Sequence, residues 1–215
     1  IMKLRLLSYT AALLVAVLTA GARSVTDFFT AEGADNVLGL VDRTTRLDMM
    51  DYFNSGIAHA SANTLGGQAS VTAIDSLGRW MSYSPAQGIS EQIAVLDAGK
   101  DTVLMVIETL PLPQPDSRIS FYDAEWQPLA KRPLAAPVLA DWLTADGEAH
   151  RQEVEAMLPF MMAAATYNPD TRTLTLAHSM DAYLANKDDK ANLQKWLRPS
   201  LSYSLKGRKF EPQNR

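Results

Sequence analysis

From about residue 68 onward, most of the chain consists of short apolar or alternating apolar and polar segments, which predict β-strands. Residues that favour turns separate these segments, so neighbouring strands are predicted to pair as hairpins. The predicted strands are 70–74, 79–83, 92–96, 102–109, 118–122, 161–167, 171–177, 201–205 and 208–210. Residues 103–107 are continuously apolar, which predicts a central strand buried on both faces.

Helical spacing is confined to a few segments. Leu47, Met50 and Phe53 recur at helical spacing before Gly56, and they predict an amphipathic helix over 45–55 with these three side chains turned inward. A hydroxyl at position 24 followed by an acid at position 27 has the form of a capping box and predicts a short helix. Further helices are predicted over 146–158, 179–184 and 188–197.

The helices alternate irregularly with hairpins, without the regular β-helix-β spacing of a parallel sheet. We therefore predict an α+β fold, with a twisted antiparallel sheet built from hairpins and helices packed on one face. Residues 23–215 are interpreted as a single domain. Because the order of a helix followed by hairpins occurs twice, two subdomains divided near 130–146 remain an alternative.

The first 22 residues have the three parts of a cleaved secretory signal peptide. Lys3 and Arg5 form a basic start, residues 6–18 are mostly apolar, and residues 20–22 read Ala-Gly-Ala. A membrane-spanning helix needs roughly 20 apolar residues, so this shorter run predicts cleavage and no remaining transmembrane segment. The protein is expected to be exported, either to the periplasm or to the outer surface and medium.

The composition narrows the possible chemistry. The chain has no cysteine, which excludes disulfides, a lipid-modified cysteine, Cys-ligated zinc, iron–sulfur clusters and thiol nucleophiles. Without residues 1–22 the chain has 18 basic and 24 acidic residues, a net charge of −6. Nucleic acid is therefore not an expected partner, because a basic surface supplies most of the affinity for it.

Motifs for catalysis are scarce. The three histidines, His59, His150 and His178, lack the spacing of a zinc-binding helix, and no Gly-x-Ser-x-Gly elbow occurs. Neither a metal nor a cofactor is expected.

One pair of carboxylates is a candidate site. Asp48 and Asp51 are three residues apart and so share a helix face, with Arg46 nearby. Such a pair can bind a cation or divide acid and base roles. The structural alternative is that Asp48 caps the helix and Asp51 is solvated.

Aromatic residues offer a second candidate. The four tryptophans can rim a groove for a peptide or glycan, or they can fill the core. Trp126, in a turn beside Glu125 and Gln127, is the best candidate for exposure.

Several motifs resemble a known family. They are Arg46-Leu-Asp-Met-Met-Asp51-Tyr-Phe-Asn-Ser-Gly56, Leu65-Gly-Gly67, Ser117-Arg-Ile-Ser-Phe-Tyr-Asp-Ala-Glu-Trp126-Gln-Pro-Leu129 and Leu201-Ser-Tyr-Ser-Leu-Lys-Gly-Arg-Lys-Phe210. The chain resembles an uncharacterised, domain-of-unknown-function family of exported proteins from Gram-negative gut and oral anaerobes. This resemblance implies a secreted or periplasmic α+β protein, and it implies no activity, cofactor or catalytic residue.

These observations favour a non-catalytic binding or interaction protein of the cell envelope, whose partner is another envelope protein, a peptide or a glycan. Its site is expected at a groove or open sheet edge that carries exposed aromatics, and the candidate residues are Arg46, Asp48, Asp51 and Trp126. One alternative is a hydrolase that acts on envelope polymers through paired carboxylates. Another is an assembly subunit of surface appendages with a long unpaired strand edge.

Overall fold

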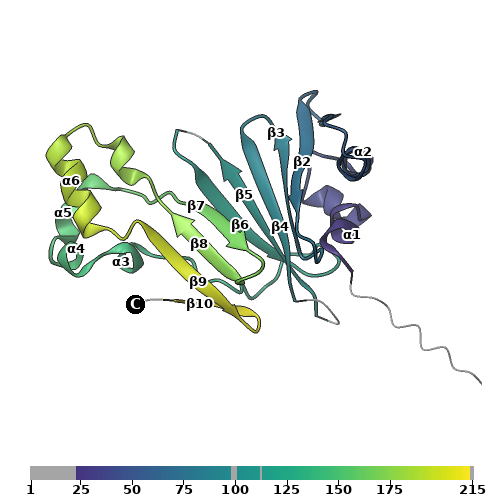
Figure 1. Cartoon of the computed structure of the whole chain (residues 1–215). Coiled ribbons are helices and arrows are strands. Elements are labelled where there is room, and N and C mark those ends of the chain that lie inside the picture. Colours follow the sequence, from purple (N-terminus) through teal and green to yellow (C-terminus); the bar gives the residue numbers. More distant parts are fainter. Residues whose placement is uncertain (1–22, 98–100, 112, 214–215) are drawn as a thin grey trace, which may run out of the picture.

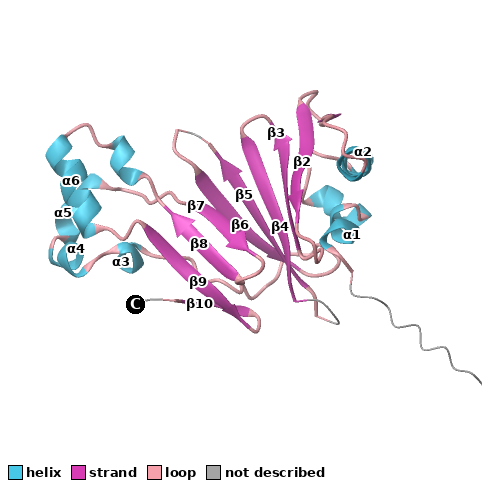
Figure 2. Ribbon diagram, in the orientation of Figure 1, coloured by secondary structure: helices cyan, strands magenta, loops and turns pink. Residues whose placement is uncertain are grey.

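The structure is a computed structural model that describes residues 23–97, 101–111 and 113–213. The predicted signal peptide, 1–22, lies outside the described residues. The elements, shown in Figures 1 and 2, are α1 (Val25–Phe29), η1 (Glu32–Asn36), α2 (Arg43–Asn54), β1 (Ser61–Ala62), β2 (Gln68–Ile74), β3 (Trp80–Ala86), β4 (Ile89–Asp97), β5 (Val103–Leu110), β6 (Asp116–Tyr122), α3 (Leu139–Trp142), α4 (Ala145–Ala149), α5 (Arg151–Met157), β7 (Ala164–Asn168), β8 (Thr173–Ala177), η2 (Met180–Tyr183), α6 (Lys187–Trp196), β9 (Ser200–Lys206) and β10 (Lys209–Pro212).

The first sheet has six strands in the order β1-β2-β3-β4-β5-β6, and all neighbours are antiparallel. The predicted hairpins of this region form, and the turn between β2 and β3 uses Gly78 at a φ of 63°, where glycine carries no steric cost. β5 lies inside the sheet, and all five residues from Val103 to Ile107 are buried. The prediction that 103–107 is a strand buried on both faces is confirmed.

A different layer covers each face of this sheet. On one face, α1 and α2 contribute Phe28, Phe29 and Met49 to a core shared with Tyr83 and Ile93. The other face packs against a second sheet of four strands, as Figure 1 shows. The six-stranded sheet therefore lies between an N-terminal helical layer and a second sheet.

The second sheet has the strand order β10-β9-β8-β7 and is also antiparallel. The α+β class and the hairpin-built antiparallel sheet are confirmed, but the strands form two sheets where one was predicted. Prolines at 128, 133 and 137 interrupt the connection after β6, so the chain leaves the first sheet and its last four strands pair with one another. The two sheets meet where the Ser117 amide donates to the Ala163 carbonyl at 3.0 Å.

The remaining helices, α3 to α6, lie on the opposite side of the molecule from α1 and α2 (Figure 1). The helix predicted over 146–158 is divided into α4 and α5 at His150. Thr144 caps α4 through a bond from the Gly147 amide to its hydroxyl at 3.1 Å. The backbone amide of Thr144 donates to the Trp196 carbonyl at 2.9 Å, which joins α4 to the end of α6.

Candidate functional site

Helix α2 carries three of the four candidate residues. It spans Arg43–Asn54 and begins two residues earlier than predicted, because Asp42 caps it by accepting a bond from the Thr45 amide at 2.8 Å. It ends before Gly56, whose φ of 65° suits a glycine after a helix.

The buried face of α2 differs from the predicted one. Its buried residues are Thr45, Arg46, Met49 and Met50, whereas Leu47 and Phe53 are 40% and 38% exposed. The prediction that Leu47 and Phe53 point inward is therefore wrong. Compared with the predicted orientation, the helix is rotated about its own axis. The apolar pattern places Arg46 on the outer face, whereas in the structure Arg46 lies in the core.

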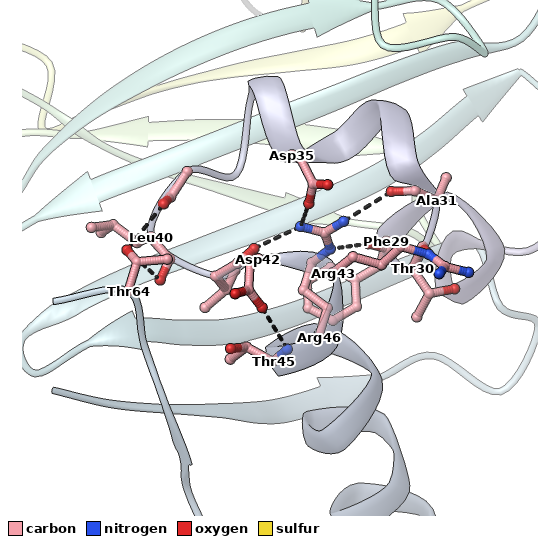
Figure 3. Close-up of polar contacts among 12 residues, drawn as sticks. Phe29, Thr30, Ala31, Asp35, Leu40, Asp42, Arg43, Thr45, Arg46 and Thr64 are labelled. Carbon is pink, nitrogen blue, oxygen red and sulfur yellow. Dashed lines mark hydrogen bonds and ion pairs between the residues drawn. The ribbon is translucent and has the colours of Figure 1, made fainter. Parts of the chain in front are cut away.

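The Arg46 guanidinium joins three segments of the N-terminal layer (Figure 3). It is fully buried and donates to the carbonyls of Phe29 at 2.5 Å, Ala31 at 2.9 Å and Val41 at 2.6 Å. Its fourth bond is an ion pair with Asp35 at 2.8 Å. Because its donors are directed at backbone carbonyls, Arg46 holds α1, η1 and α2 together and is not free to contact a ligand.

Asp48 and Asp51 lie on the outside of α2. Both are exposed, and neither side chain has a partner among the described residues. Asp48 does not cap the helix, because Asp42 does so. Neither carboxylate is among the described residues that line the groove beside this helix.

Trp126 is buried, so the tryptophan that was the best candidate for exposure fills the core, the alternative considered for all four. Its indole is 2% exposed and donates to the Phe28 carbonyl at 3.2 Å. Trp126 has a φ of 62°, and the turn is held by the Asp123 carboxylate, which accepts bonds from two turn amides. This turn directs the indole into the core beneath α1 rather than toward solvent.

An open groove lies between the end of α2 and the edge of β2. It has a volume of about 500 Å³, within the range of ligand pockets. The wall from α2 and the following loop carries apolar and aromatic side chains, including Tyr52, Phe53 and Ile57. His59 packs edge-on against Tyr52 at 4.6 Å between ring centroids, and Ile57 is 56% exposed.

The opposite wall of this groove is a sheet edge. Ser70 and Val71 of β2 line the groove. β1 pairs only with Gln68 and Ala69, and in the described part of the chain no other strand pairs with the outer side of β2. Beyond Val71 the register shifts at a β-bulge, which ends the regular edge. A short unpaired stretch of backbone therefore faces the apolar wall.

A buried carboxyl lies elsewhere on the same sheet. Glu91 of β4 is 7% exposed and accepts a hydrogen bond from the buried hydroxyl of Tyr83. It lies opposite Glu108 of β5, which forms an ion pair with Arg118 of β6 at 2.5 Å. The pKa of the Glu91 carboxyl is raised to about 7, chiefly by burial and also by the nearby Glu108, while the bond from Tyr83 and the charge of Arg118 act in the opposite direction.

Glu91 was not among the candidate residues predicted from the sequence. The available signal is its position in β4, where it shares the side of the strand that carries Ile93. An acid on the core-facing side of an alternating strand is a candidate for a perturbed pKa.

This buried carboxyl predicts a dependence of stability on pH. A carboxyl whose pKa is higher in the folded than in the unfolded chain binds more protons when folded. The free energy of unfolding is therefore expected to fall as pH rises from about 4.5 to about 7, by about 3 kcal/mol from this group. Denaturant unfolding of Glu91→Gln should lack this decrease, so the variant gains stability over the wild type at pH 8.

The exposed acid Glu32 provides the control. Glu32→Gln should keep the pH dependence of the wild type. Equal slopes for the Glu91→Gln variant and the wild type between pH 4.5 and 7 would contradict the prediction.

The described ranges contain neither a candidate metal site nor a candidate membrane span. No group of three or more His, Cys, Asp or Glu side chains in 23–97, 101–111 and 113–213 is placed to hold a metal ion. In these same ranges no helix has the length and apolar character needed to cross a membrane.

The fold and the groove define a small α+β protein with two packed antiparallel sheets and an open groove beside one sheet edge. The family described as "Protein of unknown function (DUF3256)" matches residues 17–210, so the chain belongs to this family. The resemblance to an uncharacterised family is thereby confirmed. No curated protein is significantly similar to the chain.

A solved structure shares the fold. It is described as the structure of a domain of an uncharacterized protein from Porphyromonas gingivalis W83, and it matches with a TM-score of 0.67 and 22% sequence identity. The match covers 86% of this chain and 96% of that chain. At this identity the similarity establishes the fold alone.

Proposed function

We propose that the protein is a non-catalytic binding protein of the cell envelope, exported by residues 1–22, that holds an envelope protein, peptide or glycan in the groove between α2 and β2. The groove carries this proposal, because it brings exposed apolar side chains together beside an open sheet edge. Apolar side chains gathered in a concave site are typical of recognition surfaces.

The lining of the groove supports binding over catalysis. It contains no carboxylate, lysine or arginine, and His59 is the one imidazole among the described residues that line it. A general acid and base need to converge on one reacting group. The lining offers no such pair, and Asp48 and Asp51 lie outside it.

Site-specific crosslinking tests this proposal. A photoreactive amino acid at Phe53, in intact cells, is expected to form an adduct with one partner that fractionates with the envelope. The same amino acid at Leu47 should form none, since Leu47 lies on the same helix with nearly the same exposure but does not line the groove.

Affinity measurements with the purified partner complete the test. Ile57→Gln is expected to weaken binding by about ten- to hundredfold, because an apolar side chain buried in a complex contributes about 1.5 to 3 kcal/mol. Leu47→Gln should leave the affinity unchanged. Adducts that form equally at both positions, or equal affinities for both variants, would refute the groove as the binding site.

A further inference from the structure

We propose that the occupant of the groove is an extended, basic and apolar peptide segment of a partner protein, which pairs with the edge of β2 as an added strand. This inference rests on the proposed function and specifies its partner and its binding mode. Three features carry it: the end of β1, the side chains of α2 and two unpaired carboxylates.

The end of β1 leaves room for a strand. β1 is antiparallel to β2, with Ser61 opposite Ala69. The chain that precedes Ser61 continues past Ser70 and Val71 without pairing with them, and the groove opens between the two segments. Unpaired backbone groups at an edge are satisfied by another strand, which favours a peptide over a glycan.

The apolar wall fits alternate side chains of such a strand. Val71 belongs to the face of β2 that packs against the N-terminal helices, so a strand paired beside it directs every second side chain toward Tyr52 and Phe53. The bulge after Val71 limits regular pairing to a few residues. The expected segment is therefore short, with its apolar residues two apart.

Two carboxylates on α2 beside the groove favour a peptide that carries a positive charge. Asp48 lies one helical turn before Tyr52, so it borders the groove wall on α2, and Asp51 lies next to it on the outside. Both carboxylates are exposed and have no side-chain partner among the described residues. Since the groove lining has no acid or base other than His59, a lysine or arginine on the peptide is the complementary charge.

Selection from a displayed library of random ten-residue peptides, with the purified protein as target, tests this inference. The enriched peptides are expected to carry apolar residues at alternate positions with at least one lysine or arginine. Asp48→Asn combined with Asp51→Asn should weaken the best synthetic peptide about three- to tenfold at low salt, the range for exposed ion pairs. Asp188→Asn with Asp189→Asn removes two acids from the first turn of α6 and should have no effect.

Methylation of single peptide amides tests the strand pairing. Methylation of an amide that faces β2 removes one hydrogen bond and adds a steric clash, so roughly tenfold weaker binding is expected there. Methylation of the next amide along, which faces away, should be tolerated. Such an alternation is not expected for a peptide held only by its side chains.

The outcomes separate this inference from the proposed function. Peptides that bind but tolerate methylation at every amide, or that ignore the Asp48 and Asp51 variants, overturn the added basic strand and leave the groove as a binding site. Failure to enrich any peptide also overturns the inference, while the crosslinking at Phe53 still reports on the groove. Binding that is unaffected by Ile57→Gln shows that the peptides bind elsewhere and overturns the inference too.

Discussion

Replacement of Arg46 by methionine is expected to lower the free energy of unfolding by about 3 to 5 kcal/mol, the cost of removing one partner from a buried, charged hydrogen-bond network. Methionine fills much of the same space but donates no hydrogen bond. The buried carbonyls of Phe29 and Val41 and the partly buried carbonyl of Ala31 then lose this donor, and each unsatisfied buried group carries its own desolvation cost. Since small proteins are stable by only about 5 to 15 kcal/mol, the variant is left with little stability.

Urea unfolding followed by tryptophan fluorescence measures this loss. Arg43→Met is the matched control, because Arg43 is exposed on the same helix and its side chain makes one backbone bond, to Thr30 at 3.1 Å. The control should change stability by no more than about 0.5 kcal/mol. Arg46→Lys should also be destabilised, because an ammonium cannot donate along all four directions. Wild-type stability in both Arg46 variants would show that the network contributes little.

Replacement of Gly147 by alanine is expected to destabilise the protein by about 3 kcal/mol, the upper end of the usual cost of overpacking. A Cβ atom at this position would lie 2.0 Å from the Trp196 carbonyl oxygen and 2.8 Å from its carbon. Both contacts are with backbone, so no side-chain rotation relieves them. The change has to separate α4 from the end of α6 and to weaken the Thr144 bonds to the Trp196 carbonyl.

The direction of the stability change caused by Gly147→Ala distinguishes packing from helix propensity. Gly147 lies in a helix, where alanine is intrinsically favoured over glycine by about 1 kcal/mol. Propensity alone therefore predicts a gain in stability, whereas the packing predicts a loss. Gly39→Ala is the control, since a Cβ there meets nothing within 4 Å. Denaturant unfolding that shows Gly147→Ala to be as stable as the wild type would contradict the close approach of α4 to α6.

Most secondary structure was predictable from local patterns. Each predicted strand overlaps an observed one, and the capping box of Ser24 and Asp27 forms as expected. These features depend on residues that are near one another in the chain. Side-chain alternation and turn chemistry act over a few residues, so a single sequence reports them.

The candidate site was less predictable. Phe53 was expected in the core and lies on the groove, while Trp126, the best candidate for exposure among the tryptophans, is buried. The bond from the Trp126 indole to Phe28 joins residues 98 positions apart. A local pattern contains no information about such a partner, so the exposure of either side chain was beyond it.

The sequence by itself determined the α+β class, the hairpins and the lack of cysteine chemistry, because all three follow from composition and short-range pattern. The tertiary structure decided the division into two sheets, the burial of Arg46 and Glu91 and the groove beside β2. A charged or polar side chain is buried where other segments of the chain supply its hydrogen bonds. The Arg46 guanidinium bonds to residues 5 to 17 positions earlier, and Glu91 accepts a bond from Tyr83, 8 positions earlier. These partners lie on other elements, and the groove lies between α2 and β2, so the periodicity within one helix or strand does not report them.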